Sequence, residues 1–216
     1  MGNTDGAWMK SYPSIGKSTP GCWREFTAHV FDKLDGSNLR FEWSRKTGWY
    51  KYGTRKRLLD ESDKVFGSAI GLFHRTLAKD IEEVLVRQGK NACPSAVVFA
   101  EFWGPHSIAG FHKPDDDMRL TLIDVAPYKR GILGPAEFLD LFGHLDIPHY
   151  FGKLEWSGEF VRKVRAGELE SVTFEGVVGK AIVRKKLVME KAKTQAWIDR
   201  VLEIHGHDKG SRLVNS

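Results

Sequence analysis

The sequence K-L-D-G-S-N at residues 33–38 lies between two runs, Arg24–Phe31 and Leu39–Trp43, that show the alternation typical of strands. Because Asp-Gly is a common hairpin signal, the simplest interpretation is a surface turn that pairs the two strands. The same sequence places Lys33 at the end of a strand, directly before a tight turn. A lysine in that position can serve as a nucleophile if its surroundings lower its pKa.

Further charged residues lie inside apolar runs of strand character. Glu101 lies within the apolar run Ala96–Trp103, and Glu175 lies in a second one. A carboxylate in such a strand must face a polar cavity, a metal or a cation. Lys191 and Lys193 are two residues apart, so an extended chain presents both on one face. Lysine, two glutamates and a lysine pair, in this order, can together perform nucleotidyl transfer.

The chemistry explains why these residue types are needed. An attacking lysine must lose its proton near neutral pH, although its ordinary pKa is about 10.4. Neighbouring cations, Mg²⁺ and partial burial would push the pKa of Lys33 down. The same cations neutralise the charge on the α-phosphate in the transition state.

Composition sets broad limits on the protein. The chain has 216 residues, 41% of them hydrophobic, and a net charge of +5. This is a globular composition with a moderate basic bias, which permits a polyanionic partner. The two cysteines, Cys22 and Cys93, do not suggest a disulfide scaffold. No signal-peptide core or membrane-length apolar run is present, so we expect a soluble protein in the cytoplasm of a cell or of a virus-infected cell.

Apolar spacing predicts both helices and strands along the chain. Helices are expected at Ala69–Arg87, Pro135–Leu145, Phe160–Leu169 and Trp197–Ile204, and further strands at Leu120–Val125, Val172–Val178 and Ala181–Met189, the last two separated by a glycine turn. Residues 44–57 read as a loop or short strands. Since the two types are mixed without regular alternation, we expect one α+β domain over residues 1–216, with antiparallel sheets. Residues 1–20 are expected to be irregular, and residues 205–216 a polar tail.

Three other patterns carry weaker signals. Gly16–Thr19 (G-K-S-T) resembles the end of a phosphate-binding P-loop, but the glycine that the motif needs is replaced by Ser11, so a turn is favoured. Asp115–Asp117 could hold Mg²⁺, although a polar turn explains it better. His205 and His207 have no metal-ligating partners in the nearby sequence, which favours a solvated segment.

Taken together, the motifs resemble the covalent nucleotidyltransferase superfamily of ATP-dependent DNA and RNA ligases and mRNA capping enzymes. The RNA ligases of the phage RNA-ligase-2 or RNA-editing type are the most similar. The resemblance covers about residues 24–197. It implies a nucleotidyltransferase (ATP-grasp-like) domain of antiparallel sheets flanked by helices.

The resemblance assigns roles to several nucleotide-binding residues. Lys33 matches the lysine that forms the covalent AMP adduct, and Asn38 matches an asparagine of the RNA-ligase form of that motif. Glu101 matches the glutamate that holds the ribose. Ile123 stands where the family stacks an aromatic residue on adenine, which is a departure from the pattern. Glu175 matches the glutamate associated with metal and phosphate chemistry.

The paired lysines of the last motif have two possible registers. Lys191 and Lys193 fit the K-x-K spacing and match the residues that contact the nucleotide. Lys185 and Lys186 are the alternative. We prefer the first pair because the preceding Val-Met fits the motif better.

Two basic blocks, residues 40–57 and 180–193, suit contact with a phosphate backbone, and the first is interleaved with aromatic residues. Solvated sheet edges would also explain them. By resemblance, Arg55 matches the arginine that contacts the 5′-phosphate end, with Arg45 as its rival. The residues expected to bind nucleic acid are Arg45, Arg55, Lys56 and Arg57.

The resemblance implies an ATP-dependent RNA ligase that joins 5′-phosphate and 3′-hydroxyl ends. Its cofactors would be ATP and Mg²⁺, with a lysyl-AMP intermediate and an adenylated 5′ end. Few residues follow Lys193, so we expect a minimal adenylation domain without a C-terminal domain. The alternatives are a minimal ATP-dependent DNA ligase, a noncatalytic module that binds nucleic-acid ends, and a basic structural domain with chance motifs.

Overall fold

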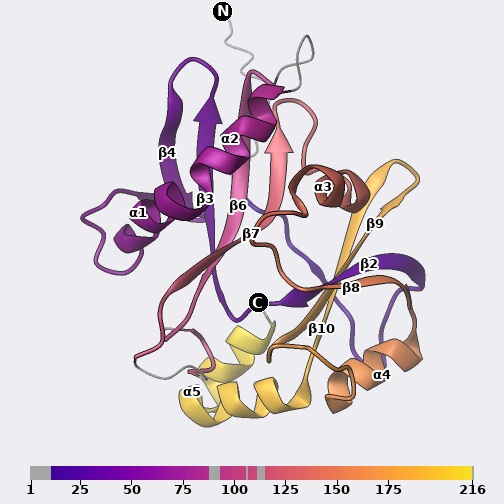
Figure 1. Ribbon diagram of the computed structural model, residues 1–216. Helices are drawn as coiled ribbons and strands as arrows, with labels where there is room; N and C mark the ends of the chain where they lie inside the picture. The colour runs from indigo at the N-terminus through magenta and orange to yellow at the C-terminus, as the bar shows by residue number, and fades with distance from the viewer. Residues whose placement is uncertain (1–10, 88–92, 106, 111–114, 216) are drawn as a thin grey trace, which may run out of the picture. The chain divides into compact units, whose positions relative to one another are not determined.

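The computed structural model describes residues 11–87, 93–105, 107–110 and 115–215. The chain divides into two compact units, each containing a five-stranded sheet (Figure 1). Unit 1 comprises the residues up to Pro13, Ser37–Phe102 and Arg119–Ile147, and unit 2 comprises Ser14–Gly36, Trp103–Met118 and Pro148–Ser216. Mixed helices and mainly antiparallel strands confirm the expected α+β class.

The sheet of unit 2 has the strand order β1-β10-β9-β2-β8. Its strands are β1 (Gly16–Lys17), β2 (Phe26–Lys33), β8 (Tyr150–Trp156), β9 (Gly176–Val183) and β10 (Lys186–Lys193). Neighbouring strands are antiparallel except β1, which runs parallel to β10. One face packs on α4 (Gly158–Ala166) through a core that includes Val30, Trp156 and Val161. The other helix is α5 (Gln195–Asn215), whose Trp197 and Val201 form a second core with Ala109.

The sheet of unit 1 has the order β5-β4-β3-β6-β7. Its elements are β3 (Gly36–Ser44), β4 (Gly48–Thr54), β5 (Leu58–Leu59), β6 (Ser95–Trp103), β7 (Arg119–Pro127), α1 (Gly67–Thr76), α2 (Ala78–Arg87) and α3 (Pro135–Phe142). Phe41 of β3 stacks on Phe73 of α1 with ring centroids 3.9 Å apart. Both rings are buried, so this aromatic pair fixes α1 to the sheet.

The turn at residues 33–38 differs from the hairpin that the sequence suggested. β2 and β3 lie in different sheets, so the turn carries the chain from one sheet to the other. Asp35 is buried, and its Oδ2 accepts a hydrogen bond from the backbone amide of Ala109 at 2.8 Å. A carboxylate that is engaged elsewhere in unit 2 does not serve a surface hairpin turn.

The helix predicted over Ala69–Arg87 is two helices that meet at Leu77. The Thr76 hydroxyl donates to the carbonyl of Leu72 at 2.9 Å, a bond that bends helices. Leu77 is itself buried, so the apolar pattern continues through the break and conceals it.

The predicted glycine turn between the last two strands is also wrong. Gly179 lies inside β9, and the turn falls at Arg184 and Lys185. A Cβ at Gly179 would overlap the ring of Trp156, so this glycine makes room for a buried tryptophan.

Residues 11–20 and 205–215 contain more secondary structure than the sequence predicted. Within the segment expected to be irregular, Gly16 and Lys17 form β1; residues 1–10 lie outside the described residues. Most of the expected polar tail is helical, because α5 continues to Asn215 across a kink at Gly206.

Strand β8, at Tyr150–Trp156, was not predicted from the sequence. In the described part of the chain, no helix is both long and apolar enough to cross a membrane.

Candidate nucleotidyltransferase site

The centre of the candidate site is a row of three residues across unit 2. The strand registers pair Lys33 of β2 with Gly176 of β9, and Gly176 with Lys193 of β10. Gly176 has φ of +144°, and a Cβ there would overlap the carbonyl of Ala192. A glycine is therefore required at this position, which lies between the two lysines in the row.

Glu175 connects the two lysines of this row. Its Oε2 lies 2.9 Å from Nζ of Lys33, and its Oε1 lies 3.0 Å from Nζ of Lys193. The side chains of Glu175 and Lys193 are 4% and 3% exposed, whereas that of Lys33 is 20% exposed. One buried carboxylate thus holds two ammonium groups, and the more accessible of them is the predicted nucleophile. Removing one partner from such a cluster leaves a buried charge unpaired.

Lys191 lies two residues before Lys193 and shares its face of β10. Burial, together with the charges of Lys193 and Lys33, lowers the pKa of Lys191 to about 8, while Glu175 opposes the shift. The pKa of Lys193 is also lowered by burial, again opposed by Glu175. The Nζ of Lys193 also lies 4.1 Å from the ring centroid of Trp197. This face therefore carries concentrated positive charge, suited to an anionic ligand.

Lys17 adds a cation that the sequence analysis missed. It pairs in register with Lys191 across β1 and β10, and its charge contributes to lowering the pKa of Lys191. Its Nζ donates to Oδ1 of Asn215 at 2.6 Å. Lys17 belongs to the Gly16–Thr19 motif that was interpreted as a turn. Only the pairing of β1 with β10, which the local sequence does not reveal, places it here.

Strand β1 is only two residues long, yet buried polar contacts fix it. The backbone amide of Ser18 donates to the carbonyl of Lys191 at 2.9 Å. The indole of Trp156 donates to Oγ of Ser18 at 3.0 Å, and that hydroxyl donates to Glu190 at 3.1 Å. These bonds hold Lys17 beside Lys191.

Asp35 is a second residue that the site predictions left out. Burial raises its pKa, and the nearby carboxylate of Glu175 raises it further. The signal was present in the sequence, since Asp35 belongs to the K-L-D-G-S-N stretch, but it was interpreted as a turn residue.

The acidic side chains of the site are its candidate metal ligands. The described residues contain no group of three or more His, Cys, Asp or Glu that could hold a metal ion. Mg²⁺ commonly uses only one or two protein carboxylates together with substrate phosphates. Glu175 and Asp35 are the carboxylates that such a mode would use, and both oxygens of Glu175 are engaged by Lys33 and Lys193 in this structure.

The other predicted nucleotide-binding residues lie in unit 1. Asn38 lies in β3, Glu101 in β6 and Ile123 in β7. The carboxylate of Asp124, next to Ile123, accepts a hydrogen bond from the phenol of Tyr12. The pKa of Tyr12 is raised by burial, then by Asp124, and also by the charge of Glu101. Glu101 and Asp124 thus belong to one polar group inside an apolar sheet.

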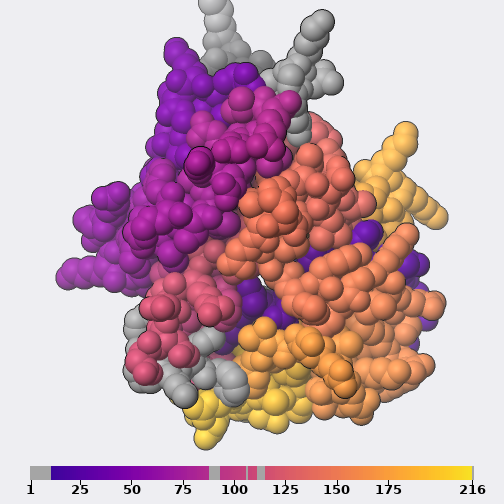
Figure 2. All heavy atoms as spheres, in the orientation of Figure 1, coloured from indigo at the N-terminus to yellow at the C-terminus, as the bar shows by residue number. Residues whose placement is uncertain are grey.

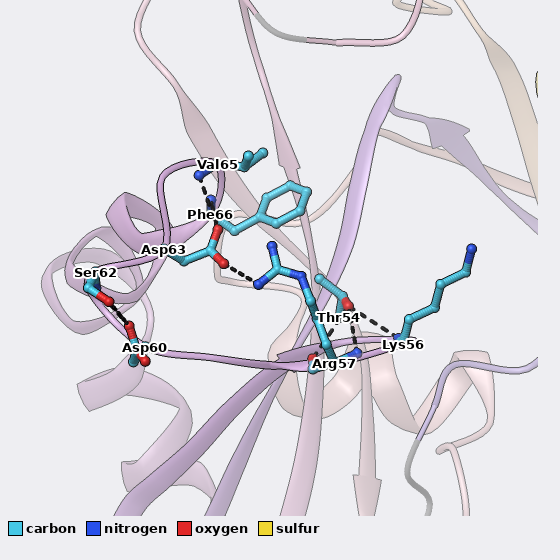
Figure 3. A network of polar contacts seen from close by, with 8 residues as sticks. All are labelled: Thr54, Lys56, Arg57, Asp60, Ser62, Asp63, Val65 and Phe66. Atoms are coloured by element: carbon cyan, nitrogen blue, oxygen red, sulfur yellow. Dashed lines mark hydrogen bonds and ion pairs between the residues drawn. The ribbon is translucent and has the colours of Figure 1, made fainter.

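The predicted nucleic-acid contacts flank β4: Arg45 precedes the strand, and Arg55, Lys56 and Arg57 follow it. Arg55 donates to the carbonyl of Tyr12 at 3.0 Å, and Arg45 donates to the carbonyl of Val86 at 3.3 Å. Figure 3 shows that Arg57 points toward Asp63, with which it forms an ion pair, whereas Lys56 points away from this network. Of these exposed cations, Arg57 already has an acidic partner.

The alternative lysine pair lies in a different environment. Lys185 and Lys186 are exposed at the turn between β9 and β10. Counted over the whole residue, Lys191 and Lys193 are 8% and 5% exposed, and both lie beside Glu175.

Comparisons with known proteins bear on the fold. Neither a scan with protein-family models nor a search among curated proteins finds a match to the sequence. An archaeal ATP-dependent RNA ligase matches 88% of this chain and 50% of its own, at 16% identity and a TM-score of 0.59. A variant of Naegleria gruberi RNA ligase with AMP and Mn matches 83% of this chain and 52% of its own, at 20% identity and a TM-score of 0.59.

The chain has the nucleotidyltransferase fold of ATP-dependent RNA ligases. A further structure, Naegleria gruberi RNA ligase with PPi, matches with a TM-score of 0.58 at 19% identity. The chain spans about half the length of the solved ligases that it resembles.

Proposed function

We propose that this chain is the adenylation domain of an ATP-dependent RNA ligase, with Lys33 as its nucleophile. The observation that carries the proposal is the arrangement of Lys33 and Lys193 on the two oxygens of the buried Glu175. A partly exposed lysine beside buried cations is suited to attack a phosphate. The likeness of the fold to RNA ligases supports the same assignment.

In the first step, Nζ of Lys33 attacks the α-phosphorus of ATP. A P–N bond forms, the bond to the bridging oxygen breaks, and pyrophosphate leaves. Lys33 must give up its protons, and Glu175 lies within reach to accept one. Lys191 and Lys193 offset the negative charge that accumulates on the phosphate oxygens.

In the second step, AMP passes from Lys33 to a 5′-phosphate end. In the third, a 3′-hydroxyl attacks that adenylated end, the strands are joined, and AMP is released. By resemblance, Glu101 holds the ribose, Ile123 packs on the base, Asn38 contacts the nucleotide and Arg55 contacts the 5′-phosphate. We assign nucleic-acid contacts to Arg45, Lys56 and Arg57 as well.

The proposed reaction includes Mg²⁺, which neutralises phosphate charge when it is bound. Glu175 is the proposed ligand, and Asp35 offers a second carboxylate close to it. One or two carboxylates complete a magnesium site when phosphate oxygens supply the remaining ligands.

The test is the intact mass of the protein after incubation with ATP and Mg²⁺. The wild type should gain the mass of one AMP, and Lys33→Ala should gain none. Lys153→Ala is the matched control, because Lys153 is an exposed lysine of the same sheet outside the site. An adduct on Lys33→Ala, or none on folded wild type that is not already adenylated, would overturn the proposal.

The choice of RNA requires a second measurement. Adenylated protein should join 5′-phosphate and 3′-hydroxyl ends of RNA faster than those of DNA of the same sequence. Faster sealing of DNA nicks would instead identify a minimal DNA ligase. Binding of 5′-phosphate ends without any adduct would identify an end-binding module.

A further inference from the structure

Strands β9 and β10 extend beyond the rest of their sheet. β2 pairs with β9 only as far as Lys180, and β1 pairs with β10 only at Glu190 and Lys191. The described pairings leave residues 181–189 as a two-stranded ribbon. Its atoms are visible at the surface at the right of Figure 2, in yellow. An isolated two-stranded ribbon gains little stability from its own pairing. The extension of β9 and β10 is therefore better explained by a function than by stability.

The turn at the end of this ribbon has an unfavourable sequence for its backbone. Arg184 has φ of +48° and Lys185 has φ of +64°. Two successive left-handed residues in a two-residue hairpin loop make the I′ turn, which strongly favours Asn-Gly. Long side chains with a Cβ are strained there. Strain of this kind persists where a function requires the side chains.

The side chains at the turn are basic and accessible. Arg184, Lys185 and Lys186 are exposed, and none forms an ion pair with a described residue. Ile182 and Val183, directly before them, are 53% and 39% exposed. Three cations beside two apolar side chains fit a polyanion that also offers apolar surface. A nucleic-acid strand, with phosphates and sugars in alternation, has that chemistry.

We propose that residues 182–186, the hairpin tip, bind the phosphodiester backbone of the RNA substrate. Lys186 and Lys193 are at opposite ends of β10, which at strand rise are about 23 Å apart. The hairpin tip is therefore a separate contact, remote from the reacting end. Naming the polyanion as RNA rests on the proposed function, whereas the contact with a phosphate backbone does not.

The decisive variant replaces the two strained residues with the sequence that their turn prefers. Arg184→Asn with Lys185→Gly keeps the I′ turn, removes two positive charges and should leave the melting temperature equal or higher. Arg162→Gln with Lys209→Gln is the matched control, because both residues are exposed in unit 2 and the change in net charge is the same. The probe is a fluorescent RNA of about 24 nucleotides with a 5′-phosphate, titrated without ATP at several salt concentrations.

We expect the hairpin variant to bind this RNA about 5- to 20-fold more weakly than wild type at ~0.1 M salt. The slope of log affinity against log salt should fall by about one to two, one for each lost phosphate contact. The charge control should change both quantities much less. An RNA of about three nucleotides, too short even when extended to span ~23 Å from the site and reach the tip, should not distinguish the variants.

Equal binding by wild type and the hairpin variant would overturn the proposal, and so would an equal loss in the charge control. Formation of the AMP adduct is measured by mass on the same proteins. This second measurement tests the proposed function, whereas RNA binding tests the hairpin contact. An unchanged adduct with weakened RNA binding supports the hairpin tip as a backbone contact. If no protein forms the adduct, the proposed function fails, while the binding comparison still tests the contact.

Discussion

The two ends of the β9–β10 pair carry the same kind of residue in opposite surroundings. At one end, Lys191 and Lys193 are buried beside Glu175, and burial lowers the pKa of each. At the other end, Lys185 and Lys186 are exposed, Lys185 in the strained turn and Lys186 directly after it. Burial lowers the pKa of a lysine and suits it to chemistry on a phosphate group. An exposed, hydrated lysine instead attracts anions over a longer range. Spacing in the sequence alone does not separate the two roles.

The largest effect should come from Glu175→Gln at the buried end. Two ammonium groups would lose their shared carboxylate, so we expect the free energy of unfolding to fall by about 3–5 kcal/mol. Formation of the AMP adduct should slow by about 100-fold or more. Urea unfolding and the rate of adduct formation measure the two effects. Glu159→Gln, which removes an exposed partner of Lys163, should change neither by much.

The next effect should separate stability from activity. Lys191→Met removes a buried cation, so the free energy of unfolding at pH 7 should rise by about 1–3 kcal/mol while adduct formation slows at least tenfold. Because the folded pKa of about 8 lies below the unfolded pKa near 10.4, the wild type should gain stability between those pH values. The variant should lack that part of the gain. Urea unfolding at pH 7 and pH 9.5 tests this prediction. An identical pH dependence in both proteins would show that Lys191 does not carry a buried charge with a lowered pKa.

A smaller effect should identify the role of Lys17. Lys17→Ala removes a cation beside Lys191, so adduct formation should slow by about tenfold. Because Lys17 contributes to lowering the pKa of Lys191, the alkaline decline in rate should move to higher pH. The measurement is the pH profile of adduct formation. Asn215→Ala removes the partner of Lys17 but keeps its charge, so its profile should stay close to that of the wild type.

The smallest effect should appear at the exposed end. Lys185→Gly relieves a left-handed residue with a side chain, so the protein should become more stable by about 1 kcal/mol. Its rate of adduct formation should match wild type, because the turn lies outside the buried cluster. Thermal unfolding and the mass assay test both statements. Destabilisation would show that the Lys185 side chain makes a contact that offsets its strain.

The sequence predicted the fold class and most elements because alternation and helical spacing record which face is buried. Glu101 was correctly predicted to lie within an apolar strand, β6, whereas Glu175 lies directly before β9 and not inside the strand that the sequence predicted. Lys17 was missed because strand pairing across long sequence separations leaves no local signal. The hairpin turn was placed at Gly179, since a glycine needed for packing against Trp156 looks the same as one needed for a turn.

The requirement for glycine at position 176 also shapes how this domain can vary. Its backbone conformation and the nearby Ala192 carbonyl exclude any side chain. In a library of all single substitutions, position 176 should tolerate no replacement, although it carries no reactive group. A homologue that kept every lysine and glutamate of the site but lost this glycine would therefore retain the ligase motifs in its sequence and lack their arrangement in space.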